Sequence, residues 1–151
     1  MRKRTFLIGT ALIAMSFGLT GCWGAESKAG GVADGKLAPC PDSPNCVSTQ
    51  ADLDDSYHRM EPIPFTGSLA DAKSTILAAI ESMPRTKVIV AAPTYIHAEF
   101  RTALFRYVDD VEFSINTDDG VIDFRSASRM GYGDMEANRK RMNALVAQIQ
   151  N

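Results

Sequence analysis

Hydrophobic and polar side chains alternate along three segments in the second half of the chain, and this pattern restricts the fold more than any other feature. The alternation runs over residues 95–101, 110–115 and 122–125. Because successive side chains of a strand point to opposite faces, the pattern predicts an antiparallel sheet with one buried face. The other face would carry a polar set, and would be an interface if a partner covered it: His97, Glu99, Arg101, Glu112, Asp123 and Arg125.

Asp119-Gly120 predicts a hairpin turn between the last two of these strands. A two-residue turn at this position places Ile115 opposite Phe124 on the buried face. It also puts Glu112 diagonal to Arg125 on the polar face.

Two further segments have the period of a helix. The first begins after Ser68, which forms a capping box variant with Asp71, and Pro84 ends it. The second is capped by Asp134, and Asn138 is the polar member of its apolar stripe. With short strands at 60–65 and 87–92, the sequence predicts an α+β domain. We expect four or five antiparallel strands, in the order β-α-β-β-β-β-α, with both helices on one face.

The N-terminus has the pattern of a bacterial lipoprotein signal. Arg2, Lys3 and Arg4 precede an apolar run at residues 6–19, which ends in Leu-Thr-Gly-Cys22. A run of about 14 residues is too short for a bilayer, which needs roughly 20. The pattern predicts cleavage of residues 1–21 and acylation of Cys22, of the palmitate type. An ordinary secretory signal peptide or an uncleaved anchor would be the alternatives.

The predicted location is the cell envelope, outside the cytoplasm. Trp23 stands where an aspartate would suggest retention at the inner membrane, so the outer membrane facing the periplasm is favoured. After cleavage, 13 basic and 18 acidic residues remain, and this acidic balance is not that of a nucleic-acid-binding protein. The membrane contact is expected to come from the lipid.

Residues 24–39 are rich in Gly, Ala, Ser and Lys, which is typical of a flexible linker. Residues 22–39 are therefore expected to be an acylated cysteine and a tether of about 20–24 Å. The remaining residues, 40–151, suffice for one globular domain.

Cys40 and Cys46 are the two cysteines left after acylation, and an oxidising compartment favours a disulfide between them. The prolines and turn-forming residues between them allow the chain to fold back. A redox-active pair or a metal site are the alternatives. Both would suit C-x-x-C better, and His58 and His97 are the only histidines. We expect no metal and no cofactor.

Three motifs resemble the domain of unknown function 1499 family. They are Cys40-Pro-Asp-Ser-Pro-Asn-Cys-Val-Ser48, Val108-Asp-Asp-Val-Glu-Phe113, and Arg125-Ser-Ala-Ser-Arg-Met-Gly-Tyr-Gly-Asp134 with Asn138-Arg-Lys-Arg141. The resemblance spans residues 40–151. It implies little about activity, because the family's biochemical role is not established. Typical members carry Leu and Gly where this chain has Met135 and Glu136, and many members look exported or membrane attached.

These motifs predict a polar cluster where the hairpin meets the final loop and helix. Three interpretations are open: a structural network of ion pairs, a pocket for a small anionic or sugar-like ligand, and an acid and base pair of a hydrolase. In the second, Arg125 and Arg129 would bind a carboxylate or phosphate; in the third, Asp110 and Glu112 would act about 7 Å apart on one strand face. The expected members are Asp109, Asp110, Glu112, Arg125, Ser126, Ser128, Arg129, Asp134, Asn138 and Arg139.

The sequence assigns no catalytic residue. No G-x-S-x-G motif precedes a helix, and nothing links either histidine to a serine. The favoured function is a lipid-anchored envelope protein that acts as a non-catalytic binding or structural module, with an envelope protein or a small ligand as partner. An envelope hydrolase is the alternative, so enzymatic activity stays open.

Overall fold

The structure, a computed structural model, describes residues 26–151. The predicted signal peptide and the predicted acylation site at Cys22 lie outside this part of the chain. The main sheet is antiparallel, in the order β3-β8-β7-β6-β5, and β4 pairs with β8 beside β3. Its strands are β3 (Cys46–Ser48), β4 (Ile63–Pro64), β5 (Thr86–Ala91), β6 (Tyr95–Arg101), β7 (Val108–Asn116) and β8 (Val121–Ser128).

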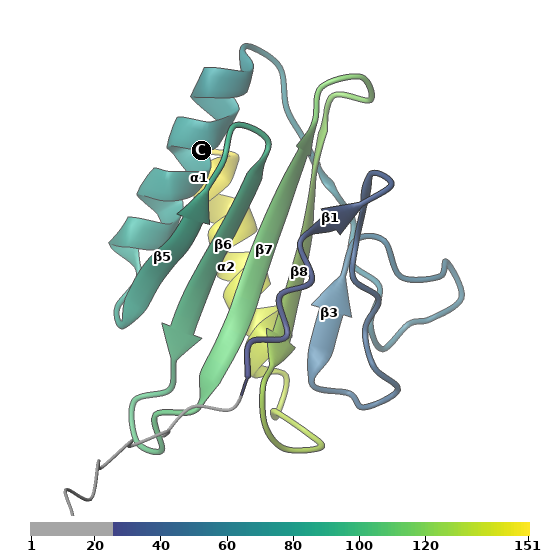
Figure 1. Cartoon of the computed structure of the whole chain (residues 1–151), viewed down its shortest axis with the longest axis vertical. Helices are drawn as coiled ribbons and strands as arrows, with labels where there is room; N and C mark the ends of the chain where they lie inside the picture. The colour runs from purple at the N-terminus through teal and green to yellow at the C-terminus, as the bar shows by residue number, and fades with distance from the viewer. Residues whose placement is uncertain (1–25) are drawn as a thin grey trace, which may run out of the picture.

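Two helices, α1 (Leu69–Ser82) and α2 (Ala137–Ile149), cover one face of this sheet (Figure 1). The predicted α+β class and the placement of both helices on one face are confirmed. The sheet has six strands rather than four or five, because Cys46–Ser48 also pairs with β8. Three residues without polar and apolar alternation give no strand signal, so β3 was missed.

The hydrophobic core lies between the helices and the sheet. Each long strand contributes its alternate apolar residues, as the pattern predicted, and the helices contribute theirs at helical spacing. Ser68 caps α1 as expected: its side chain accepts from the Asp71 amide at 3.1 Å, and Asp71 accepts from the Ser68 amide. The central buried side chains are Ile76, Ile80, Ile96, Val111, Phe113, Phe124, Met142 and Leu145.

The register of the β7–β8 hairpin differs from the predicted one by two residues. Phe113 lies opposite Phe124, and Glu112 lies directly opposite Arg125 rather than diagonal to it. The cause is a turn of four residues, 117–120, in place of two. The Asn116 side chain accepts hydrogen bonds from the amides of Asp118 and Asp119 and so shapes this longer turn. A shift of two residues keeps every side chain on its predicted face.

Over β7 and β8, the second face of the sheet is covered by the segment that was predicted to be a flexible tether (Figure 1). Residues 27–31 lie along β7, and a small hairpin follows, formed by β1 (Val32–Ala33) and β2 (Lys36–Leu37). Figure 1 shows this purple segment on the face of β7 and β8 opposite the helices. In the structure, residues 27–37 therefore lie on the sheet, whereas their composition predicted a flexible tether that continues to residue 39.

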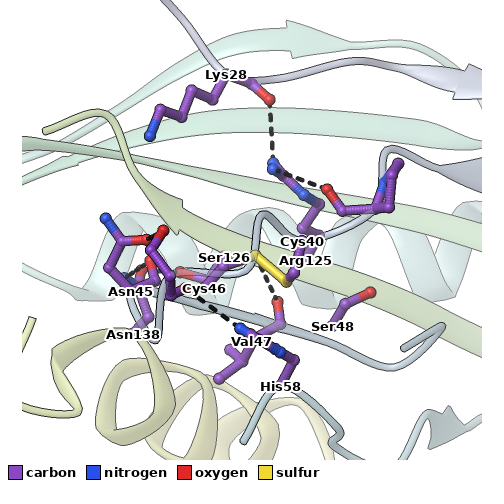
Figure 2. The surroundings of a disulfide bond; sticks show 12 residues. Lys28, Cys40, Asn45, Cys46, Val47, Ser48, His58, Arg125, Ser126 and Asn138 are labelled. Carbon is purple, nitrogen blue, oxygen red and sulfur yellow. Dashed lines mark hydrogen bonds between the residues drawn. A yellow bond between two sulfur atoms is a disulfide. The ribbon is translucent and has the colours of Figure 1, made fainter. Parts of the chain in front are cut away.

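The predicted disulfide between Cys40 and Cys46 is present, with an S–S distance of 2.05 Å. It links the covering segment to the first residue of β3 (Figure 2). Within residues 26–151, neither helix is both long and apolar enough to cross a bilayer.

Candidate functional site

The predicted polar cluster is divided in two by the sheet itself. Neighbouring residues of a strand point to opposite faces, so Asp109 and Asp110 cannot join one network. Asp110, Glu112, Arg125 and Arg129 lie on the face under the covering segment, and we call them the covered network. The helix side holds a second set, which we call the helix-side network: Asp109, Ser126, Ser128, Asp134 and Asn138.

Asp110 is the centre of the covered network, and its side chain is fully buried. Arg129 binds both carboxylate oxygens, with Nε 2.9 Å from Oδ2 and Nη2 2.7 Å from Oδ1. His97 Nε2 donates to Oδ1 at 2.7 Å. The covering segment completes the site, because Ser27 Oγ donates to Oδ1 at 2.9 Å and the Lys28 amide donates to Oδ2 at 2.7 Å. Five hydrogen bonds therefore converge on one carboxylate.

This arrangement fixes the charges of Asp110 and Arg129. Burial alone would raise the pKa of Asp110, but the hydrogen bonds from His97, Arg129, Lys28 and Ser27 outweigh it and hold that pKa far below its usual range. The hydrogen bonds with Asp110 in turn raise the pKa of Arg129. At neutral pH Asp110 is therefore a carboxylate and Arg129 a cation.

Glu112 and Arg125 form the second ion pair of the covered network. The Glu112 side chain is fully buried, Arg125 is 3% exposed, and Arg125 Nη1 lies 3.0 Å from Glu112 Oε2. The other oxygen of Glu112 accepts from the Tyr95 hydroxyl at 2.7 Å and from the Gly31 amide at 3.0 Å. Burial and the contact with Glu112 raise the pKa of Tyr95, which keeps its hydroxyl protonated as a donor.

Arg125 also binds the backbone of the covering segment. Its Nη1 donates to the Lys28 carbonyl at 3.0 Å (Figure 2), and its Nη2 reaches the Pro39 carbonyl at 3.5 Å. Its Nε is buried and has no hydrogen-bond partner among residues 26–151. The guanidinium is thus held between a carboxylate on the neighbouring strand and two backbone carbonyls.

The helix-side network is centred on Asn138, the polar residue on the apolar stripe of α2. Its amide Nδ2, which has two hydrogens to donate, lies within hydrogen-bond distance of three acceptors: the Asn45 carbonyl at 2.9 Å, Ser128 Oγ at 3.0 Å and Asp134 Oδ2 at 2.6 Å. Its carbonyl oxygen accepts from Ser126 Oγ at 2.5 Å and from Arg141 Nη1 at 2.7 Å. Asn138 therefore ties α2 to both β8 and the disulfide loop.

The start of α2 differs from the prediction in detail. Asp134 does accept the amides of Glu136 and Asn138, at 3.0 and 2.8 Å, as a capping side chain would. Met135 and Glu136 both have positive φ, however, so the helix begins at Ala137. Ordinary side chains in this backbone conformation are uncommon.

Several members of the two networks were not among the predicted site residues. Arg141 forms a close ion pair with Asp109 and lies 5.1 Å above the Phe100 ring. Glu99 binds Arg129 at 2.7 Å on the covered face. Tyr95, His97 and Glu99 alternate along β6 on the same face as Asp110 and Glu112 of β7. Because β6 and β7 are consecutive and pair with each other, this alternation could have indicated the three residues as neighbours of the two carboxylates. No sequence signal indicated Ser27, Lys28 or Gly31.

The sequence comparison agrees with this fold and these motifs. The model of a family described as Protein of unknown function (DUF1499) matches residues 36–149. The chain belongs to this family. Among curated proteins, none matches the chain. The matched region contains the charged side chains of both networks, whereas the segment 27–31 that closes the covered network precedes it.

Arg139 belongs to neither network of the DUF1499 domain and lies in an open groove of about 390 Å³, which Asp134 of the helix-side network also lines. Its guanidinium donates to the carbonyls of Tyr57 at 2.7 Å and Arg59 at 3.2 Å. The groove runs between the disulfide loop and the loop before α2, and its lining includes Pro44, Val47, Tyr57, Met135 and Arg139. Binding of a small anionic or sugar-like ligand stays a prediction. The two arginines expected to bind it, Arg125 and Arg129, are already engaged by carboxylates.

The geometry of the DUF1499 domain does not favour acid and base catalysis at Asp110 and Glu112. The two carboxylates share a face as expected, but both are fully buried and saturated with donors. His97 and Ser27 both bind Asp110, whereas a hydrolase triad has the histidine between the serine and the carboxylate. Within residues 26–151 there is no group of three or more His, Cys, Asp or Glu side chains that could hold a metal ion.

Proposed function

We propose that this protein is a non-catalytic, lipid-anchored module of the cell envelope, in which the covered network fixes the segment after the anchor to the sheet. One observation carries the proposal: buried charges bind the backbone of residues 28–31. Asp110 accepts the Lys28 amide, Glu112 accepts the Gly31 amide, and Arg125 donates to the Lys28 carbonyl. Charged groups that satisfy buried amides and carbonyls of an adjoining segment hold that segment in one place.

The anchor part of the proposal rests on the sequence. The apolar run ending in Leu-Thr-Gly-Cys22 supports cleavage before Cys22 and its acylation, and Trp23 favours the outer membrane, facing the periplasm. The Cys40–Cys46 disulfide supports an oxidising compartment, since such bonds are rare in the cytosol. In this arrangement the lipid attaches the protein to the membrane. The covered network holds the segment that follows the acylated cysteine against the sheet.

The non-catalytic part rests on the state of the charged groups. A general acid or base must reach substrate and exchange a proton near the working pH. Asp110 has a strongly lowered pKa and no exposed surface, so it cannot fill that role. The arrangement instead has the properties of a structural network, in which each buried carboxylate accepts several hydrogen bonds.

Replacing Cys22 with serine tests the anchor. We expect the Cys22→Ser protein to be lost from the outer-membrane fraction, because acylation supplies the attachment there. Fractionation of cells on a density gradient and immunoblotting measure this, with the wild type expected in the outer membrane. The control is the double variant Cys40→Ser with Cys46→Ser, which should stay in the membrane fraction. Retention of Cys22→Ser in the outer membrane at the wild-type level would contradict the proposal.

A further inference from the structure

Two loops at one end of the sheet expose large apolar side chains. The loop between β6 and β7 exposes Leu104, Phe105 and Tyr107, and the loop between β8 and α2 exposes Met130, Tyr132 and Met135. We call these six residues the loop surface. Leu104 is 80% exposed and Tyr132 76%. Clustered apolar side chains of this size on a protein surface mark an interaction site more often than scattered ones do.

The two loops are neighbours in space. The Arg129 amide donates to the Val108 carbonyl at 3.1 Å, which joins the start of one loop to the end of the other. Tyr107 and Met130 line the same hollow. Figure 1 shows both loops at the lower end of the sheet, away from the β7–β8 turn.

The chain enters the fold from this same end. Ser27 and Lys28 bind Asp110, and Gly31 binds Glu112, so the segment runs along β7 in the direction of β7 itself. Followed backwards, it leads toward Val108 and the loop surface. Figure 1 shows the purple start of the described chain at the lower end of β7.

Only three residues, 23–25, separate Cys22 from Glu26, the first described residue. Even in a fully extended chain, the four residue-to-residue steps from Cys22 to Glu26 span at most about 14 Å. This is less than the 20–24 Å expected for a flexible tether of 16 residues, because residues 27–37 lie on the sheet. An acyl chain on Cys22 would therefore hold this end of the domain close to the polar layer of the membrane, which is roughly 5–8 Å thick on each side.

Charge distinguishes the two ends of the sheet. The loop surface has Arg106 exposed at its tip, between Phe105 and Tyr107, and the exposed Glu136 that follows Met135 is paired with Lys140 at 3.7 Å. The opposite end carries Asp118 and Asp119 in the exposed β7–β8 turn. Aromatic side chains favour the membrane–water interface, and an arginine there is attracted to anionic headgroups. The apolar end with its cation thus suits a lipid surface, and the acidic end does not.

We propose that the loop surface lies in the headgroup layer of the membrane that carries the anchor, and so holds the DUF1499 domain in a fixed orientation on the bilayer. This inference rests on the proposed acylation of Cys22. The lipid supplies the attachment, and Leu104, Phe105 and Tyr132 supply the orientation. The acidic β7–β8 turn then points away from the membrane.

Site-specific fluorescence in vesicles tests the orientation. The full-length acylated protein is purified and reconstituted into vesicles of phosphatidylethanolamine and phosphatidylglycerol. A polarity-sensitive dye is attached at Leu104→Cys, at Tyr132→Cys or, as the control at the opposite end, at Thr117→Cys. All three positions are exposed, so the substitutions leave the core intact. Nitroxide-labelled lipid and aqueous iodide serve as the two quenchers.

We expect lipid quenching to be severalfold stronger at positions 104 and 132 than at 117, and iodide quenching to show the reverse order. Adding Phe105→Asp to the Tyr132→Cys protein should weaken lipid quenching at 132, whereas Thr117→Asp in the same protein should not.

Three results would overturn the inference, and they separate it from the proposed function. If the wild type is not acylated and does not float with vesicles, the anchor and the orientation both fail. If the protein floats but the three positions are quenched alike, the anchor stands and the orientation is wrong. If 104 and 132 are shielded from iodide without lipid quenching, a protein covers the loop surface instead of the membrane.

Discussion

Replacing Arg125 with alanine is expected to lower the free energy of unfolding by about 3–5 kcal/mol, which is a large share of the stability of a domain this size. The reason is that Glu112 is fully buried, and without Arg125 its negative charge would have no positively charged partner. The carbonyls of Lys28 and Pro39 would lose a donor as well. Urea unfolding at neutral pH, followed by circular dichroism, measures the loss.

The matched control for Arg125 is an exposed ion pair. Lys140, on α2, and Glu136, just before it, lie 3.7 Å apart, and both side chains are about 70% exposed. Lys140→Ala should change the free energy of unfolding by no more than about 1 kcal/mol. The double variant Arg125→Met with Glu112→Met should recover part of the loss, since no unpaired charge remains. If Arg125→Ala were as stable as Lys140→Ala, Arg125 would be solvated or free for a ligand, contrary to this account.

Asp110→Asn is expected to be the second strongly destabilising change, also by about 3–5 kcal/mol at neutral pH, because Arg129 loses the fully buried one of its two carboxylate partners and keeps only Glu99. The effect should depend on pH. The pKa of Asp110 is lowered in the folded protein, so its carboxylate stabilises the fold above the ordinary aspartate pKa of about 3.9. That contribution is lost as pH falls below this value. The difference between wild type and variant should therefore shrink on acidification.

Urea unfolding between neutral pH and acid measures this dependence. Asp118→Asn is the control, because Asp118 is exposed in the β7–β8 turn and should contribute little at any pH. Equal losses of stability on acidification in the wild type and in Asp110→Asn would show that Asp110 carries no special charge contribution.

The parts of the fold set by local patterns could be predicted from the sequence. The Ser68 capping box defined α1, and alternation assigned the faces of β6, β7 and β8 correctly. Elements that depend on distant partners could not be predicted. The three residues of β3 form a strand because β8 offers an edge for pairing, and the hairpin register depended on the Asn116 side chain.

The sequence predicted most of the charged residues of the candidate site, but it did not predict which of them contact one another. Alternation already places Asp109 and Asp110 on opposite faces, so the division into two networks was available from the strand pattern. The segment that covers Asp110 and Glu112 could not be predicted from the strand pattern. The contacts are made by backbone groups of Lys28 and Gly31, which lie 82 and 81 residues from their partners in a segment whose composition resembles a linker. Backbone donors have no sequence signal of their own.

Hydrogen exchange of the Lys28 and Gly31 amides tests most directly whether the covered network fixes the segment after the anchor. The measurement is amide exchange followed by nuclear magnetic resonance on the intact, acylated protein in detergent micelles at neutral pH. Both amides donate to buried carboxylates, so we predict slow exchange, with protection close to that of the β7 amides. Exchange of both at the rate of an unstructured peptide, while β7 stays protected, would mean that the segment is a free tether and would contradict the account.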